Sequence, residues 1–154
     1  MTGSQYCTFS VDDIALAVPV AQVQEVMRHQ PVTPVPGAPP EVRGLINLRG
    51  QIVVALDLRR RLGRPDTGEV PLDVVVRSGG ESVALLVDAI GEVIEVGEER
   101  PLPVPANLPA PLAVLAAGVL PLAGRIVVVL DVDAAVELPS APERAPDPAP
   151  SNER

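Results

Sequence analysis

Residues 44–62 read GLINLRGQIVVALDLRRRL, and residues 118–136 read GVLPLAGRIVVVLDVDAAV. The two stretches align without a gap at an offset of 74 positions, and they share glycines, an apolar run and the aspartate that follows it. Such a shared spacing is typical of one supersecondary unit that a chain builds twice. The polar residues of the turn are not shared, because Asn47 and Arg49 stand where the second copy has proline and alanine. The shared positions therefore indicate a scaffold, and Asn47 and Arg49 are candidates for function.

Each copy predicts a hairpin followed by a short helix. In the first copy, segments 45–48 and 51–56 flank a two-residue turn, and Asp57 is placed to cap a helix that runs to residue 62. The apolar runs 52–56 and 126–130 show no alternation with polar residues. A strand of that kind is covered on both faces, so each unit needs a second layer to pack against.

Prolines and glycines divide the rest of the chain into short β-like segments. There are 19 prolines and 12 glycines, and each half has about five such segments and a Pro-rich connection, at residues 31–40 and 101–111. Five short strands can close into a small barrel, which removes exposed sheet edges. The sequence therefore predicts an all-β fold of two five-stranded β-barrels that share a hydrophobic core, with short helical turns.

The composition also predicts the limits of the folded part. Residues 6–138 are expected to form one domain, with lobes mainly at 6–63 and 70–138. Residues 1–5 are small and polar and are expected to be disordered. Residues 139–154 hold five prolines and no large apolar side chain, so they cannot bury enough surface to offset the entropy of ordering. We expect a Pro-rich disordered tail there.

The charge of the chain bears on its partners. The formal net charge is −8, and an acidic chain repels the phosphate backbone of nucleic acids. One dense basic cluster is present, comprising Arg59, Arg60, Arg61 and Arg64. We interpret it as a solvated helical face. A small-barrel nucleic-acid-binding protein is the alternative from a different class, and it predicts salt-sensitive binding to DNA or RNA.

Residue types that carry chemistry are scarce. Cys7 is the single cysteine and His29 the single histidine, and we expect both to be structural or incidental. The pair Glu92 and Glu95 is interpreted as exposed charge. With no catalytic motif and no ligand cluster, the sequence predicts a protein that is not an enzyme and that uses no metal and no cofactor. The lone cysteine and the lack of a signal-peptide or membrane-length apolar run predict a cytoplasmic location.

The segment 42–59, VRGLINLRGQIVVALDLR, resembles the signature of the CheW family of bacterial chemotaxis coupling proteins. Further segments match in order: VQEV at 23–26, VDAI at 87–90 and GRIVVVLD at 124–131. Together they cover about residues 6–138.

This resemblance implies a fold and a function. CheW-like proteins consist of two SH3-like β-barrels and are not enzymes. They couple a CheA-type histidine kinase to methyl-accepting chemoreceptors, join the regulatory domain of that kinase in rings, and are recruited to membrane-associated receptor arrays without inserting into the membrane. The receptor tip lies in a groove between the barrels. By matched position, the receptor-binding residues are Val23, Glu25, Gly44, Asn47 and Arg49. The resemblance identifies no kinase-binding residue here.

Three of these residues carry more specific expectations. Glu25 and Arg49 are predicted to form an ion pair between two segments, since an arginine fork can bind a carboxylate with two bonds. Gly118 stands at the position equivalent to Gly44 in the second repeat. Gly44 therefore either meets a conformational requirement of the backbone or lines the groove. The segment 104–115 is unusually rich in Pro, Leu and Ala, and we expect it to alter the surface of the second lobe. An adaptor of a non-flagellar pathway, such as twitching motility or developmental regulation, is the alternative function within the family.

Overall fold

The computed structural model describes residues 4–65, 71–96, 101–122 and 124–137. The strands in these ranges are β1 Ser4–Val11, β2 Ile14–Pro19, β3 Val23–Arg28, β4 Val42–Leu48, β5 Gln51–Asp57, β6 Leu72–Ser78, β7 Glu81–Val87, β8 Ala89–Val96, β9 Ala116–Leu122 and β10 Arg125–Leu130. The short helices are η1 Val20–Gln22, α1 Leu58–Arg61, α2 Ala110–Leu115 and α3 Val132–Val136.

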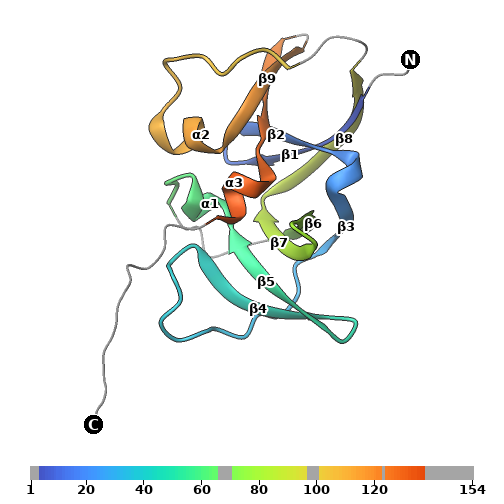
Figure 1. Cartoon of the computed structure of the whole chain (residues 1–154), viewed down its shortest axis with the longest axis vertical. Coiled ribbons are helices and arrows are strands. Elements are labelled where there is room, and N and C mark those ends of the chain that lie inside the picture. The colour runs from blue at the N-terminus through green and yellow to red at the C-terminus, as the bar shows by residue number, and fades with distance from the viewer. Residues whose placement is uncertain (1–3, 66–70, 97–100, 123, 138–154) are drawn as a thin grey trace.

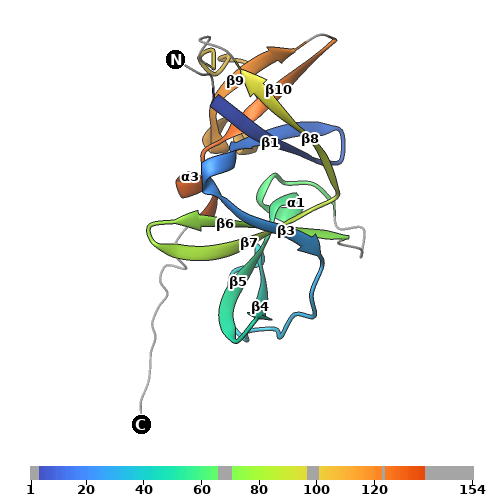
Figure 2. The same ribbon diagram turned by 90° about the vertical axis from the view of Figure 1, so that its right-hand side faces the viewer.

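The strands form two five-stranded sheets, which confirms the predicted all-β fold. One sheet has the order β8-β1-β2-β10-β9, and we call it the terminal barrel because it contains the first and last strands. The other has the order β3-β6-β7-β5-β4, and we call it the central barrel. Figures 1 and 2 show the two barrels stacked along the long axis, with α1 and α3 between them.

The two sequence repeats are exchanged between the barrels. Each barrel combines the first hairpin of one repeat, β1–β2 or β6–β7, with the last three strands of the other. Parallel pairs join the two parts: β10 pairs with β2, and β5 pairs with β7. The predicted lobes at 6–63 and 70–138 are therefore wrong. The physical reason is that each hairpin completes its sheet with strands of the other copy. The sequence repeat does not indicate which copy supplies those strands.

The largest buried cluster lies between the barrels and draws on both of them. Phe9 and Leu16 of the terminal barrel pack in one cluster with Leu56 and Leu85 of the central barrel. Smaller clusters fill the interior of each barrel. The shared core is thus the structural reason that the two sheets form one unit, since apolar burial is worth roughly 25 cal/mol per Å².

The apolar runs in β5 and β10 are only partly covered. Ile52 and Ile126 are each 61% exposed, and Val54 is 38% exposed, although both faces of these runs were predicted to be buried. Ile52 and Ile126 lie near the hairpin turns, and Val54 lies in the middle of β5. The prediction is wrong for these three residues, and they form apolar surface.

The local predictions at the helix starts are confirmed. The carboxylate of Asp57 accepts a hydrogen bond from the backbone N–H of Arg60, and that of Asp131 accepts one from Ala134, both at 3.2 Å. At the N-terminus the expected disorder of residues 1–5 is wrong for the last two. Ser4 and Gln5 belong to β1, because they pair with Val96 and Glu95 of β8. Residues 1–3 and 139–154 lie outside the described residues.

The arginine cluster of α1 links the two barrels, so its interpretation as a solvated helical face is wrong. The side chain of Arg59 is buried, and it pairs with Asp12 in the β1–β2 turn at 2.6 Å and with Asp88 in the link between β7 and β8. Arg61 donates to the backbone carbonyls of Ala134 and Ala135 in α3, at 3.0 and 3.2 Å. Because α1 lies where the chain crosses between barrels, its charges meet partners from both.

Candidate functional site

The turn between β4 and β5 has a strained backbone. Arg49 has φ +56° and Gly50 has φ +86°, as a two-residue hairpin turn of the mirror type requires. The side chain of Asn47 accepts a hydrogen bond from the N–H of Gly50 at 2.8 Å and holds the turn closed. Glycine or asparagine adopts a positive φ at lower cost than arginine does. A residue held in this costly conformation is a candidate for function. At this turn the cost is accompanied by an arginine side chain, which glycine or asparagine would not supply.

Arg49 and Glu25 form the predicted ion pair. Nη1 of Arg49 lies 2.5 Å from Oε2 of Glu25, and Nη2 lies 2.8 Å from Oε1, so the contact is bidentate. The hydrogen bond from Arg49 holds the pKa of the Glu25 carboxyl below its usual range. The Arg49 side chain is nevertheless 71% exposed. The pair therefore fixes the guanidinium on β3 while leaving much of it open to solvent.

Two of the predicted site residues have structural surroundings. Val23 begins β3, pairs with Val76 of β6 and packs against the shared core. Gly44 is buried, and a Cβ atom there would lie 2.2 Å from the carbonyl oxygen of Thr33. Gly118, its equivalent, would meet the carbonyl oxygen of Leu102 at 2.8 Å. The close backbone approach explains the glycine in both repeats.

The structure brings three of the five predicted residues together. Glu25, Asn47 and Arg49 gather where β3 approaches the β4–β5 turn, whereas Val23 lies two positions earlier on β3 and Gly44 lies inside the sheet. The residue that stands opposite Arg49 in the repeat alignment, Ala123, is outside the described residues.

Sequence reasoning missed an apolar surface on two edge strands. Val26 of β3 is 39% exposed, and Ile90 and Val93 of β8 are 36% and 58% exposed. β3 and β8 occupy equivalent edges of the two sheets, and Figures 1 and 2 both place them on one side of the molecule. These residues look like ordinary core aliphatics in the sequence. The feature that distinguishes them is structural: β3 and β8 are edge strands, with a neighbouring strand on one side only.

The remaining titratable groups of note have structural roles. Asp73 is fully buried, and it accepts hydrogen bonds from Nδ1 of His29 at 2.7 Å and from the N–H of Gln30 at 3.1 Å. Burial raises the pKa of the Asp73 carboxyl, although His29 and Gln30 act in the opposite direction. Burial likewise raises the pKa of the Cys7 thiol. The contacts of Asp73 anchor the start of the Pro-rich connection after β3. The raised pKa of Cys7 leaves its thiol in the protonated, less reactive form.

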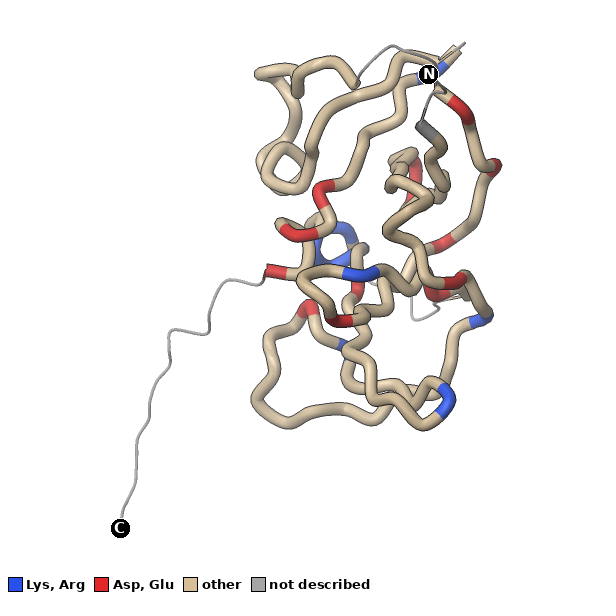
Figure 3. Tube along the Cα trace, turned by 45° about the vertical axis from the view of Figure 1, so that its right-hand side comes forward, with Lys and Arg blue, Asp and Glu red and all other residues tan. Residues whose placement is uncertain are grey.

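No site for nucleic acid or metal stands out in the described residues. Figure 3 shows acidic positions along both barrels, and the one run of adjacent basic positions is α1, where Arg59 and Arg61 are engaged internally. Within the same ranges, no group of three or more His, Cys, Asp or Glu side chains could hold a metal ion. None of the described helices is long and apolar enough to cross a membrane.

Comparison with known proteins gives a consistent result. Residues 5–139 match the family model described as the CheW-like domain. The chain is 32% identical to the chemotaxis protein CheW of Rhizobium meliloti (strain 1021), over 85% of this chain and 86% of that one. It is 30% identical to the chemotaxis protein CheW of Bacillus subtilis (strain 168), over 96% of each.

A solved structure agrees with these relatives. The crystal structure of the scaffolding protein TtCheW from Thermoanaerobacter tengcongensis superposes with a TM-score of 0.80 at 25% identity, covering 90% of this chain and 94% of that one. The two exchanged barrels, the Glu25–Arg49 pair and these comparisons point to the same conclusion. This chain belongs to the CheW-like family of chemotaxis adaptor proteins.

Proposed function

We propose that this adaptor couples a CheA-type histidine kinase to methyl-accepting chemoreceptors through separate surfaces for the two partners. The receptor tip binds the side that carries β3, β8 and the β4–β5 turn. The regulatory domain of the kinase binds the far ends of the barrels. Because the chain then links kinase and receptor, it is recruited from the cytoplasm to membrane-associated receptor arrays.

The Glu25–Arg49 pair is the observation that carries the receptor surface. An arginine at positive φ, fixed by two hydrogen bonds and still largely exposed, presents a preorganised set of donors. A helical receptor tip offers carbonyls, carboxylates and an apolar stripe to such a surface. Within this proposal Asn47 shapes the turn, while Gly44 and Val23 act by positioning the strands that carry it.

Exposed aliphatic side chains support the same surface. Val26, Ile90 and Val93 supply apolar area on the two edge strands, and Val26 directly follows Glu25 on β3. Exposed apolar area of this kind is typical of a protein-binding site. The receptor would therefore be held by apolar burial and oriented by Arg49.

The internal repeat supports the proposed kinase surfaces. Ile52 and Ile126 occupy equivalent positions in the two repeats and are equally exposed, each at 61%. They lie on the β4–β5 and β9–β10 hairpins, which Figure 1 shows at opposite ends of the molecule. A partner with the same double-barrel architecture can dock at each end in a head-to-tail manner, and contacts of this type close into rings or extend.

Direct binding measurements with purified partners test the division. Arg49→Ala is expected to weaken binding of a receptor-tip fragment and to leave binding of the kinase regulatory domain unchanged. Ile52→Glu and Ile126→Glu are expected to show the reverse. Arg77→Ala, an exposed arginine on β6 outside both proposed surfaces, serves as the control for loss of charge. The proposal fails if wild-type protein binds neither partner, or if Arg49→Ala weakens both partners equally.

A further inference from the structure

The two repeats differ in one connection. In the first repeat, Thr33 bridges to Leu45, and the N–H of Asp57 donates to the carbonyl of Glu41 at 2.7 Å. In the second repeat, Leu102 bridges to Val119. The N–H of Asp131 there donates to the carbonyl of Leu115 at 2.8 Å. The backbone is therefore equivalent at both ends of the connection, but the second repeat has five more residues between these points, and they include α2.

Helix α2 covers the face of the terminal barrel that turns toward the shared core. Leu112 and Leu115, three residues apart, are both buried in that core. Val128 of β10 belongs to the same core cluster and is only 6% exposed. When the offset of 74 is extended back from the strands into this connection, Ala38 matches Leu112. The equivalent of Val128 in the first repeat is Val54, which is 38% exposed. The central barrel thus lacks the cover that α2 gives to its sibling.

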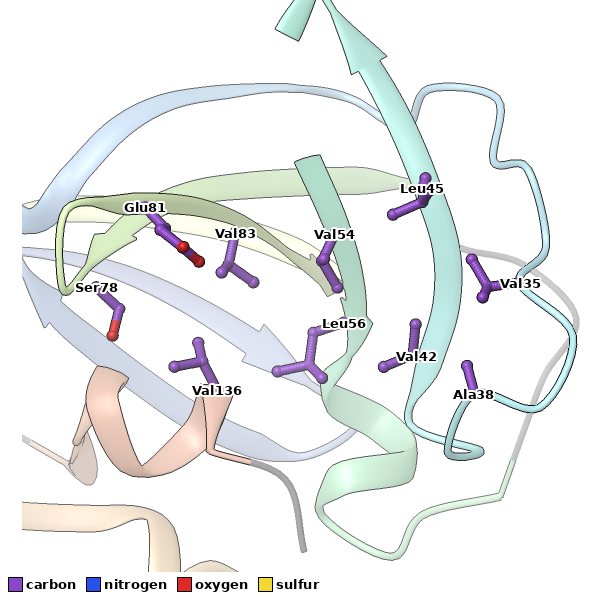
Figure 4. Close-up of a pocket in the computed structure, with 10 residues that line it drawn as sticks. All are labelled: Val35, Ala38, Val42, Leu45, Val54, Leu56, Ser78, Glu81, Val83 and Val136. Atoms are coloured by element: carbon purple, nitrogen blue, oxygen red, sulfur yellow. The ribbon is translucent and has the colours of Figure 1, made fainter. Parts of the chain in front are cut away.

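A cavity occupies the place of the missing cover. Its volume is about 360 Å³, and its wall is mainly aliphatic. Figure 4 shows Val54, Val83 and Leu56 on the sheet side, Val136 of α3 opposite them, and Ala38 at one end. The other lining residues are Val35, Val42, Leu45, Ser78 and Glu81. The cavity is continuous with the edge of the shared core, because Leu56 belongs to both.

Acidic side chains lie at the end of this cavity formed by Ser78 and Val136, where Arg61 donates to the backbone carbonyl of Glu137 at 3.1 Å. Glu81 lines the cavity, Asp133 accepts a hydrogen bond from the hydroxyl of Ser78 at 2.6 Å, and Glu137 directly follows Val136. Within the described ranges, none of these three carboxylates forms an ion pair with a basic side chain. An occupant with basic residues beside its apolar face would therefore gain favourable electrostatics.

We propose that this cavity binds a short amphipathic helix from a partner protein, in the manner in which α2 covers the terminal barrel. The helix would insert two leucine-sized side chains spaced three residues apart, and it would carry lysine or arginine on its flanks. Helix α2 is the template for the apolar face, and Glu81, Asp133 and Glu137 select the basic flanks. The proposal goes beyond the receptor and kinase surfaces above, because Glu25, Arg49, Ile52 and Ile126 are not among the lining residues. The cavity does border the proposed kinase surface, since Val54 lies two positions from Ile52 on β5.

The test uses a synthetic peptide as the probe. The peptide contains the α2 motif Pro-Leu-Ala-Lys-Leu, in which lysine replaces the exposed Val114, and it is extended with alanine and lysine to about 16 residues because shorter helices are marginal in water. Methyl NMR spectra of the full chain are recorded during titration. We expect shifts at the methyl groups of Val54, Val83 and Val136 and none at Val93. Increasing salt should weaken the binding.

Matched variants distinguish the cavity from a general apolar surface. Ala38→Leu places in the first repeat the side chain that the second repeat has, and it should weaken peptide binding at least tenfold. Ala117→Leu, at an exposed position of β9, should leave binding unchanged. If Ala38→Leu does not fold, Val54→Thr keeps the side-chain volume while lowering the apolar character of the wall, and it should weaken binding several-fold.

Several results would overturn the proposal. One is the absence of shifts at the three valines at millimolar peptide. Another is equal binding of a control peptide with serine in place of both leucines. A third is concentration-dependent self-association of the chain that Ala38→Leu abolishes, since a second copy would then occupy the cavity. None of these results depends on receptor or kinase binding, so the proposal can fail while the proposed function stands.

Discussion

Arg49 and Glu25 are joined by two hydrogen bonds that tie the β4–β5 turn to β3, the strand at the other end of the sheet order. The arginine stands at positive φ and remains largely exposed. Exposed ion pairs contribute little to stability, because solvent screens the two charges. The value of this pair therefore lies in orienting the turn and its guanidinium, and its loss should affect binding far more than folding.

The first prediction concerns charge reversal. Glu25→Arg and Arg49→Glu should each weaken binding of the receptor tip, because each places like charges opposite one another. The double variant should recover part of the binding if orientation of the turn is what matters. Binding is measured by titration with a receptor-tip fragment, and thermal unfolding should show only small changes. Absence of any recovery in the double variant would contradict simple pairing.

The second prediction is a pH dependence of the same pair. Because the pKa of folded Glu25 is lowered, its contribution to stability is complete above the ordinary glutamate pKa of about 4.3 and is lost as pH falls through the folded value. Carboxyl NMR titration of the wild type should show this low pKa. In Arg49→Gln it should rise toward the ordinary value, and an unchanged pKa would mean that Arg49 is not its cause.

The third prediction concerns the link between the barrels. Arg59→Gln leaves Asp12 and Asp88 without their buried cation, and we expect a loss of about 2–3 kcal/mol. This expected loss of stability lies at or below the lower end of the range for breaking a buried ion pair, because both aspartates are partly exposed. Urea unfolding measures it. Arg64→Gln is the control: Arg64 is more exposed, so its removal should cost less than about 1 kcal/mol. Equal effects of the two changes would contradict a special role of Arg59.

The fourth prediction concerns the backbone crossing at Gly44. Gly44→Ala should destabilise the protein by roughly 2–4 kcal/mol, because the added Cβ meets the carbonyl of Thr33 at 2.2 Å. Gly37 also has a positive φ, +82° against +147° at Gly44, but has open space around it, so Gly37→Ala should cost only about 1–2 kcal/mol. Thermal unfolding of the two variants compares steric contact with backbone strain. If both cost the same, strain alone explains the glycine.

Parts of the candidate site could be predicted from the sequence because they depend on short spacings. The family motif identified Glu25 and Arg49, and the turn chemistry of Asn47 follows from residues three positions apart. Two further motif segments gained a role only in the structure. The D-L-R segment at 57–59 and the V-D-A-I segment at 87–90 meet through Arg59 and Asp88. That contact joins residues 29 positions apart, and no local pattern indicates it.

The sequence by itself determined the local units: two hairpins, their turns and the aspartates that cap the following helices. These features depend on neighbours within a few residues, so composition and spacing suffice to predict them. Only the tertiary structure decided which hairpin completes which barrel and that Arg59 is buried between them. It also decided that Val54 is partly exposed while its repeat equivalent Val128 is buried in the core cluster that includes residues of α2. Such outcomes depend on which distant segments compete for the same apolar surface, and identical local sequences can end in either environment.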